Sequence, residues 1–319
     1  MTDYREDLLQ RYWKYQETQF ANEQTLFDSQ HVKPASPPVF IRNEGAWKNV
    51  IVNPDTNEKK KNEKLLGLIP KGEWHKWFGS MNSSQALAQS VLGNLFIYDS
   101  LHYLSEIKDD EGMNLFGKAQ FLKDNFEMEY KINYLGEPRR TSLDGYISGD
   151  YRIAIECKFT EAEVGTCSRP RLEPTDSNYE SEHCNGTYSV QRGRKERCSL
   201  TEIGVLYWRY VPQLFILKND TDKCLLNKNY QLVRNILAIG VKPNGIVSLN
   251  DGHVLLIYDE RNPAFQQGGK GFISYTETRT ALQEPTMLRK CSWQRIVKHL
   301  REKNILSWLT ENLSLKYGL

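Results

Sequence analysis

One segment, which carries two charges at the end of an apolar run, constrains this chain more than any other. Residues Tyr151–Phe159 read YRIAIECKF, and Ile153–Ile155 form an unbroken apolar run, as in strands buried on both faces. Glu156 and Lys158 follow directly. A charge at the end of a buried strand needs a partner or a metal ion to offset the cost of losing water. Because a glutamate two residues before a lysine is also common on solvated strand edges, that alternative stays open.

The segment before this strand adds a second carboxylate to the same face. Residues 141–148 (TSLDGYIS) and the strand that follows flank a Ser-Gly-Asp turn, which is typical of a β-hairpin. Side chains alternate along a strand, so Ala154, Glu156 and Lys158 share one face. With the turn at its centre, the hairpin places Asp144 opposite Ala154. Glu156 then lies one diagonal step away, within about 7–8 Å.

Two carboxylates and an ammonium group on one surface suit a hard cation. Mg²⁺ takes oxygen ligands and is commonly held by one or two carboxylates, waters and a substrate phosphate. We therefore expect Asp144 and Glu156 to bind Mg²⁺ or Mn²⁺, which could activate water and stabilise charge on a phosphate. Lys158 could orient that water or offset the developing negative charge.

Hydrophobic periodicity gives a coarse map of the other elements. Strict alternation predicts a strand over Phe126–Ile132, and apolar runs predict strands at 254–258 and, more briefly, at 49–52. Helical spacing predicts helices over residues 4–27, 80–96, 201–217, 229–239 and 288–315. Loops are expected over the lysine-rich run Asn57–Lys64, over 160–199 and at the glycine-rich Gly268–Gly271.

The hairpin resembles the signature of a known group of enzymes. TSLDGYISGDYRIAIECKF resembles the D…(D/E)-x-K motif of the PD-(D/E)XK nuclease superfamily, with Asp144, Glu156 and Lys158 at the motif positions. Three further segments resemble parts of a bacterial, restriction-endonuclease-like branch of that superfamily, namely Ser83–Phe96, Asn229–Ala238 and Leu256–Phe265. Together they extend from about Trp77 to Trp293.

This resemblance implies both a fold and a reaction. It implies an α/β, restriction-endonuclease-like core with a central mixed sheet flanked by helices and with helical additions at both ends. Residues 1–76 would form an N-terminal helical and extended region, and 77–319 a nuclease domain with a cysteine-bearing insertion at about 160–228. The implied activity is metal-dependent hydrolysis of DNA in restriction or phage defence. Because a single site cuts one strand at a time, cleavage of both strands would favour a homodimer. A catalytically inactive DNA-binding or scaffold protein is the alternative, and RNA as substrate stays open.

The resemblance also implies further site residues, with one departure. Many superfamily members carry a glutamate on the helix before the sheet, but Ser83–Phe96 has no carboxylate. Gln85 could fill that role, or Glu129 could supply the missing charge; a structural amide is the alternative for Gln85. In related nucleases a glutamine on a later helix approaches the site, which suggests Gln231. Arg234 shares its helix face, and a solvated face is the other interpretation.

Four of the six cysteines suggest a second metal site. Cys167, Cys184, Cys198 and Cys224 surround the polar insertion and could hold structural Zn²⁺ or an iron–sulfur cluster. Because no C-x-x-C pair is present, unlinked thiols remain an alternative. The other two cysteines, at 157 and 291, are expected in the core.

Charge and other motifs exclude more than they identify. A net charge of +2 decides little, but Asn57–Lys64 and Gln191–Cys198 concentrate basic residues that could contact phosphates or form solvated loops. No Walker A, G-x-S-x-G or H-E-x-x-H motif is present. The longest apolar runs are too short to cross a membrane, and we expect a cytoplasmic protein.

Overall fold

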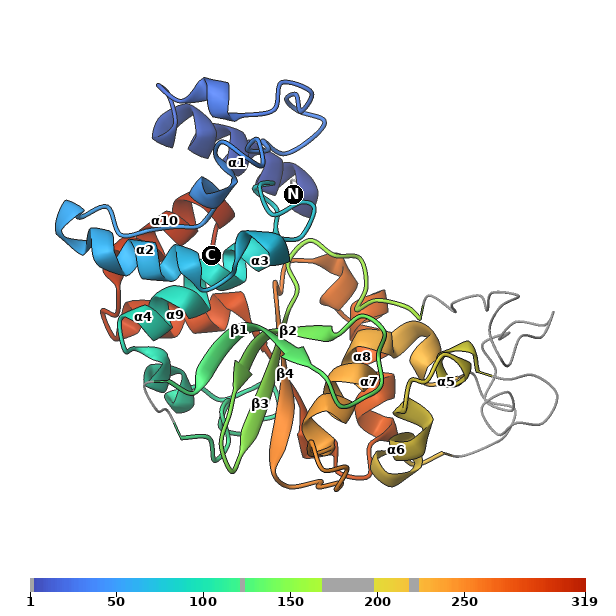
Figure 1. Cartoon of the computed structure of the whole chain (residues 1–319). Coiled ribbons are helices and arrows are strands. Elements are labelled where there is room, and N and C mark those ends of the chain that lie inside the picture. Colours follow the sequence, from blue (N-terminus) through green and yellow to red (C-terminus); the bar gives the residue numbers. More distant parts are fainter. Residues whose placement is uncertain (1–2, 121–123, 168–197, 218–223) are drawn as a thin grey trace.

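A five-stranded mixed sheet lies at the centre of the molecule (Figure 1). This computed structural model describes residues 3–120, 124–167, 198–217 and 224–319. The strands follow one another in chain order: β1 (Phe126–Ile132), β2 (Thr141–Ile147), β3 (Arg152–Cys157), β4 (Gly252–Tyr258) and β5 (Leu288–Ser292). Pairing is antiparallel from β1 to β3 and parallel from β3 to β5. The predicted hairpin, the strands at 126–132 and 254–258 and the mixed sheet are confirmed.

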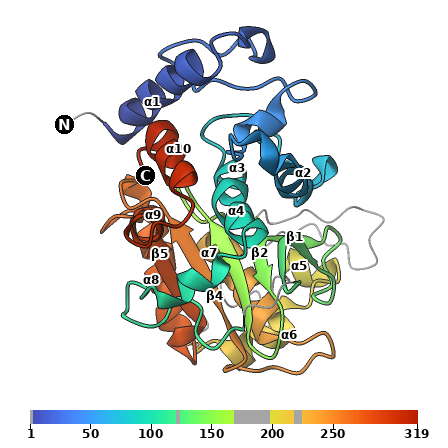
Figure 2. The same ribbon diagram turned by 90° about the vertical axis from the view of Figure 1, so that its left-hand side faces the viewer.

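Helices cover both faces of the sheet (Figures 1 and 2). One face carries the layer of α2 (Lys59–Gly67), α3 (Ser84–Ala88), α4 (Asn94–Ile97), α9 (Trp293–Glu302) and α10 (Ser307–Tyr317), and α1 (Tyr4–Gln19) packs on α10 beyond the sheet. A π-helical turn, η5 (Gln89–Gly93), joins α3 to α4. The opposite face carries α5 (Ser199–Glu202), α6 (Tyr207–Leu214), α7 (Leu226–Gly240) and α8 (Lys270–Ala281). Short 3₁₀ turns lie at Gln24–Leu26, Ala46–Asn49, Thr56–Glu58, Lys71–Glu73, Leu101–Glu106, Pro263–Phe265 and Pro285–Met287.

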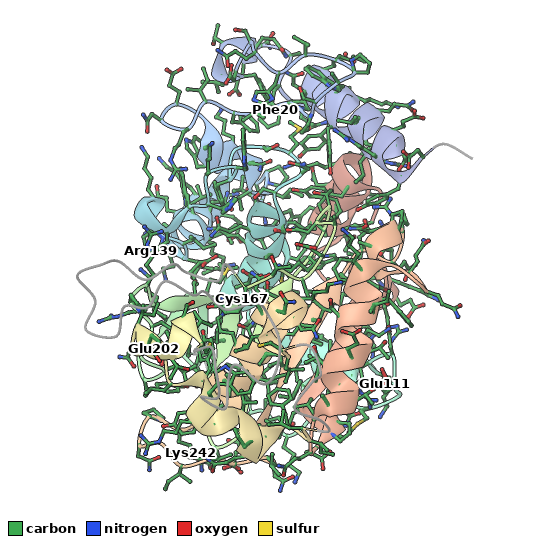
Figure 3. The ribbon with its side chains drawn as sticks, turned by 90° about the vertical axis from the view of Figure 1, so that its right-hand side faces the viewer. Phe20, Glu111, Arg139, Cys167, Glu202 and Lys242 are labelled. Atoms are coloured by element: carbon green, nitrogen blue, oxygen red, sulfur yellow. The ribbon has the colours of Figure 1, made fainter. Side chains whose placement is uncertain are left out.

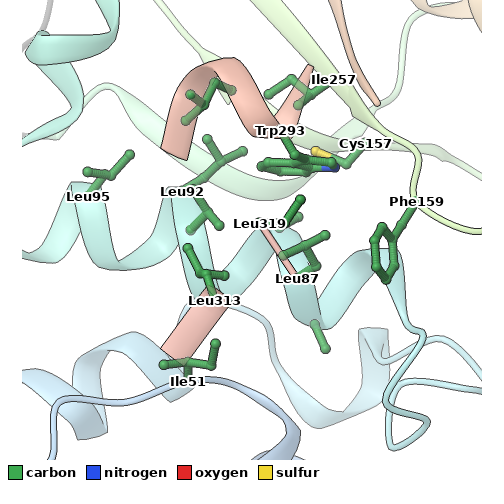
Figure 4. Close-up of a cluster of buried hydrophobic side chains, with 14 of the residues drawn as sticks. Ile51, Leu87, Leu92, Leu95, Cys157, Phe159, Ile257, Trp293, Leu313 and Leu319 are labelled. Atoms are coloured by element: carbon green, nitrogen blue, oxygen red, sulfur yellow. The ribbon is translucent and has the colours of Figure 1, made fainter. Parts of the chain in front are cut away.

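Alternation along β3 separates two buried clusters, as predicted from its sequence. Ile153, Ile155 and Cys157 belong to the cluster under α3, α9 and α10, whereas Ala154 belongs to the cluster under α6 and α7. Figure 4 shows the first cluster, where Trp293 at the start of α9 lies against the sheet beside Cys157. The indole Nε1 of Trp293 donates a hydrogen bond to the backbone oxygen of Lys158 at 3.1 Å. The C-terminal third therefore supports the end of the charged strand.

The first and last helices of the chain pack against each other. α1 lies beside α10 in Figure 2, and the rings of Tyr12 and Tyr317 meet edge to face with centroids 6.2 Å apart. Both side chains are buried. The N-terminal helix is shorter than the predicted range 4–27. It ends at Gln19, and only a short turn, Gln24–Leu26, follows it.

The strand predicted at 49–52 is wrong, because polar side chains of a distant segment, and not a neighbouring strand, satisfy the backbone of Ile51. Residues Ala46–Asn49 form a 3₁₀ turn. The backbone nitrogen of Ile51 donates to Ser90 Oγ at 2.9 Å, and Asn94 Nδ2 donates to the backbone oxygen of Ile51 at 2.8 Å. An apolar run alone did not distinguish this arrangement from a strand.

Three other predictions also need correction. The lysine-rich run is not a loop but the start of α2, in which Leu65 is fully buried. The glycine-rich run is not a flexible loop: Gly269 precedes α8 directly, at a point where a Cβ atom would collide with the backbone oxygen of Pro263. The C-terminal segment predicted as helix begins instead with strand β5, before the two confirmed helices α9 and α10.

Candidate active site

The register of the hairpin brings Asp144 and Glu156 closer than predicted. Tyr146 pairs with Ala154 and Gly145 with Ile155, so Asp144 falls opposite Glu156 and not opposite Ala154. The prediction was wrong by two positions. Because side chains alternate with period two, this shift leaves Asp144 on the predicted face. The two carboxylates therefore lie on neighbouring strands at one level of the sheet.

A third carboxylate joins this row from β1. Met128 pairs with Gly145 and Tyr130 with Leu143, which puts Glu129 beside Asp144. The backbone of Glu129 has φ +52°, a left-handed conformation that is costly for a residue with a side chain. We call Glu129, Asp144 and Glu156 the carboxylate row.

Two polar side chains hold the end of this row. The Oγ of Ser142 and the Nε2 of Gln85 both donate hydrogen bonds to the carboxylate of Glu129. Gln85 lies in α3, the helix in which the family resemblance leads one to expect a glutamate. The amide thus binds the acidic side chain that β1 supplies. Glu127, two residues earlier on β1, is exposed and does not line the pocket.

Glu156 and Lys158 form a buried ion pair at the other end of the row. Their side-chain atoms Oε1 and Nζ are 2.7 Å apart, and the residues are only 2% and 6% exposed. Lys158 Nζ also donates to Gln231 Oε1 at 2.9 Å, and Asn235 Nδ2 donates to Glu156 Oε2 at 2.7 Å. Asp144 Oδ2 accepts a 2.6 Å hydrogen bond from the backbone nitrogen of Cys157. Both carboxylate oxygens of Glu156 and the Nζ of Lys158 thus have partners within the protein that fix their positions.

A glycine allows the glutamine to reach the lysine. Gly165 has φ +88°, and a Cβ atom there would lie 2.7 Å from Gln231 Oε1. A larger residue at this position would push the Gln231 amide away from Lys158. The sequence offered no signal for this contact, because the two residues belong to separate segments.

The electrostatics of the carboxylates differ sharply. Burial, together with the charges of Glu156 and Glu129, raises the pKa of Asp144 well above its usual range. Burial acts in the same direction on Glu156, but Lys158 and Arg234 outweigh it and hold the pKa of Glu156 below its usual value. Burial would lower the pKa of Lys158, yet the nearby Glu156, Glu161 and Asp144 raise it. Lys158 is therefore a permanent cation in this setting.

One large pocket contains all the side chains predicted for the site. It has a volume of about 1210 Å³ and is lined by Gln85, Glu129, Asp144, Glu156, Lys158 and Gln231 among others. Arg234, the predicted neighbour of Gln231, also lines it. Arg139 and Arg140, exposed residues in the connection between β1 and β2, also line the pocket, and Arg139 is labelled in Figure 3. The structure thus brings together residues that lie up to 146 positions apart, from 85 to 231.

Two contributors to the site were missed by sequence reasoning. Asn235 lies one helical turn after Gln231 on α7, so the i, i+4 spacing was the available signal. Ser142 lies two residues before Asp144 in β2 and faces the same side, so strand alternation could have indicated it.

The donor set fits a divalent cation. Three carboxylates meet in the pocket beside a single ammonium, that of Lys158, and burial together with the charges of Glu156 and Glu129 raises the pKa of Asp144. Within the described part of the chain, no three His, Cys, Asp or Glu side chains are close enough together to hold a metal ion. Mg²⁺ needs only one or two protein carboxylates, with water and phosphate completing its shell. Asp144 and Glu156 meet that requirement.

The cysteine hypothesis lies partly outside the described residues. Cys184 is not described, while Cys198 and Cys224 are buried in the cluster under α6 and α7, and Cys167 packs against it (Figure 3). The four-thiolate zinc site therefore stays a prediction. Cys157 and Cys291 are confirmed as core residues. Most of the basic run Gln191–Cys198 is likewise outside the described ranges.

Comparison with known families identifies the chain. The family described as "Restriction Endonuclease associating with ARP" matches residues 8–318. The chain belongs to this family. Membership in this restriction endonuclease family confirms the predicted resemblance to a restriction-endonuclease-like branch. No similar curated protein and no similar solved structure was found. No helix within the described ranges has the length and apolar character needed to cross a membrane.

Proposed function

We propose that this restriction endonuclease family member hydrolyses DNA phosphodiester bonds with Mg²⁺ or Mn²⁺ and acts in restriction or phage defence. The observation that carries the proposal is the buried Glu156–Lys158 ion pair directly beside Asp144, on one wall of a large pocket. Family membership supports the same reaction class and implies DNA as substrate. A restriction-endonuclease-like core and a cytoplasmic location go with this proposal.

Asp144 and Glu156 would hold the metal ion. Bound there, the ion would supply Lewis acidity and lower the pKa of a water molecule near the phosphate. The hydrogen bond from the Cys157 backbone fixes one oxygen of Asp144, and Asn235 fixes one oxygen of Glu156. Preorganised oxygens of this kind need little rearrangement when the ion enters.

Lys158 would act as a cation rather than as a base. Its raised pKa keeps the ammonium protonated, so it cannot accept a proton from water at neutral pH. Glu156 and Gln231 orient the ammonium, whose remaining N–H bond can point to the attacking water or to a phosphate oxygen. This geometry favours stabilisation of developing negative charge.

Glu129 and Gln85 would complete the site at the other end of the row. The Gln85 amide holds Glu129, and both line the pocket next to Asp144. Glu129 would supply the negative charge that a helix glutamate supplies in many superfamily members, with Gln85 as its positioning residue. The four-cysteine zinc site remains a separate structural proposal.

The decisive experiment is cleavage of supercoiled and linear DNA with Mg²⁺, Mn²⁺ or EDTA. We expect metal-dependent cutting by the wild type and a loss of at least about 100-fold in Asp144→Ala and Lys158→Ala. Lys242→Ala and Asp251→Ala are matched controls, because they break an exposed ion pair away from the pocket. A folded wild type that binds DNA but never cuts it would favour the inactive DNA-binding alternative.

A further inference from the structure

Trp77 is a large apolar side chain left partly in water at the catalytic pocket. It is 47% exposed and lines the pocket that contains the carboxylate row. A single exposed apolar residue is ordinary on a protein surface. The position of this one, between the site and open solvent, is what calls for an explanation.

The backbone that carries Trp77 is tied to the carboxylate row. The backbone nitrogen of Trp77 donates to His75 Nδ1 at 3.3 Å, and the backbone nitrogen of His75 donates to Gln85 Oε1 at 2.8 Å. The same Gln85 side chain donates through Nε2 to Glu129. The Gln85 amide therefore fixes both the backbone of the segment from His75 to Trp77 and the carboxylate of Glu129. The segment that carries Trp77 is thus held in a defined position relative to the carboxylate row.

The immediate neighbours of the Trp77 indole suit a nucleotide. His31 meets it edge to face, with ring centroids 6.0 Å apart, and also lines the pocket. The Nζ of Lys76 lies 5.1 Å from the indole centroid. An exposed aromatic face beside a cation matches the two parts of a nucleotide, a flat base and a phosphate. Arg139 and Arg140, also on the pocket lining, provide two further cations for the backbone.

We propose that Trp77 is a base-stacking residue, which holds a nucleobase of the DNA strand that is cut at the carboxylate row. This inference rests on the proposed nuclease function and adds to it a feature of the substrate, namely a base turned out of the helical stack near the scissile phosphate. The pocket volume of about 1210 Å³ exceeds the usual range for small-ligand sites, which leaves room for more than one nucleotide. Stacking on an indole tolerates any base, so Trp77 would contribute affinity rather than sequence choice.

The chain offers a closely matched control for this residue. Trp47 is 41% exposed, and Lys48 Nζ lies 5.3 Å from its ring, yet Trp47 does not line the pocket. We expect Trp77→Ala to lower kcat/KM for DNA cleavage by about 5- to 150-fold, the range for loss of one stacked base. Trp77→Phe should recover most of the activity, and Trp47→Ala should stay within about twofold of the wild type. Wild-type rates for Trp77→Ala would overturn the inference and leave the nuclease proposal intact.

A binding measurement tests the contact without relying on cleavage. Lys158→Ala protein is titrated with DNA while tryptophan fluorescence is followed, with Trp77→Phe or Trp47→Phe added. Stacking predicts that quenching by DNA falls strongly when Trp77 is replaced and persists when Trp47 is replaced. Equal quenching in both double variants would overturn the inference, even if the wild type proved unable to cut DNA. The salt dependence of binding should be unchanged by Trp77→Ala, because stacking neutralises no phosphate.

Discussion

Two carboxylates in one row have pKa values moved in opposite directions, and their neighbours explain why. Glu156 has the Lys158 ammonium at 2.7 Å and the Asn235 amide at 2.7 Å, and both favour its charged form. Asp144 has the backbone nitrogen of Cys157 but faces the charges of Glu156 and Glu129. Burial and these two charges thus make Asp144 the carboxylate whose charged form is most disfavoured in the absence of a cation. This is the side chain that gains most from a nearby divalent cation.

The unfavourable environment of a charged Asp144 predicts that Asp144→Asn raises the stability of the protein but abolishes its activity. The substitution removes a carboxyl group whose charged form burial and two neighbouring carboxylates disfavour, and it keeps an oxygen that can accept the Cys157 N–H bond. In EDTA we expect the variant to unfold at a higher temperature than the wild type, although it does not cut DNA. Mg²⁺ at 100 times its dissociation constant should stabilise the wild type by about 2.7 kcal/mol and the variant much less.

Differential scanning calorimetry with EDTA and with Mg²⁺ measures both effects. Asp251→Asn is the control, since Asp251 lies in an exposed ion pair with Lys242. If Mg²⁺ shifted the unfolding temperatures of the wild type and of Asp144→Asn equally, the assignment of Asp144 as a metal ligand would be wrong.

At the scale of elements, periodic side-chain patterns predicted the strands correctly where backbone groups of neighbouring strands supply the hydrogen bonds. They failed where side chains or close packing determine the backbone. The strands at 126–132 and 254–258 and the hairpin follow from alternation and apolar runs. The segment after Asn49 looked like a strand, but side chains of distant residues, Ser90 and Asn94, complete the backbone hydrogen bonding of Ile51. The start of α8 looked like a loop, because glycine runs usually are, but Gly269 is needed there for close packing.

In the candidate site, too, local patterns predicted some of the residues and long-range contacts determine the others. Asp144, Glu156 and Lys158 could be placed together from one hairpin, since alternation fixes their common face. The link from Gln85 to Glu129 could not, because it joins residues 44 positions apart, and the left-handed backbone of Glu129 has no signal in its residue type. Long-range contacts, rather than local propensity, arrange that end of the site.

Helix α10 contains a buried lysine that should make stability depend on pH. Lys316 donates to the backbone and side-chain oxygens of Asn49 at 2.6 and 2.7 Å and lies against the rings of Tyr15 and Tyr317. Burial lowers the pKa of Lys316 to about 7. Between about pH 7 and the ordinary lysine value near 10.5, the unfolded chain therefore binds this proton and the folded chain does not. The free energy of unfolding then rises with pH across this window.

Replacing the lysine should remove that slope. We expect the wild type to gain up to roughly 5 kcal/mol from this group between pH 7 and 10.5, and Lys316→Met to lack the gain. Urea unfolding at several pH values gives the slopes, with the exposed Lys242→Met as control. Slopes are compared because the methionine also leaves the Asn49 oxygens without their donor. Parallel curves for wild type and Lys316→Met would show that Lys316 stays charged in the folded protein.

At the scale of the whole molecule, the proposed function assigns one catalytic row to a DNA substrate with two strands. The described residues contain a single Asp144–Glu156–Lys158 constellation, and one such site cuts one strand at a time. We therefore expect two copies of the chain to act together in double-strand cleavage. Light scattering during the reaction should give a dimer mass, and supercoiled plasmid should become linear without accumulation of nicked circles. A monomer that makes double-strand breaks in one encounter would contradict this expectation.

The hydrogen bond from Trp293 to the Lys158 carbonyl has a consequence for the protein during its synthesis. Asp144, Glu156, Lys158 and Gln231 have all been translated before Trp293 is added, but the strand they depend on still lacks its indole support and the packing of α9 and α10. A chain released early from the ribosome would therefore carry every catalytic group without the core that holds them in place. Under the proposed function, a chain released before Trp293 would be unable to cut DNA, which would limit the danger that aborted translation products pose to the cell's own genome.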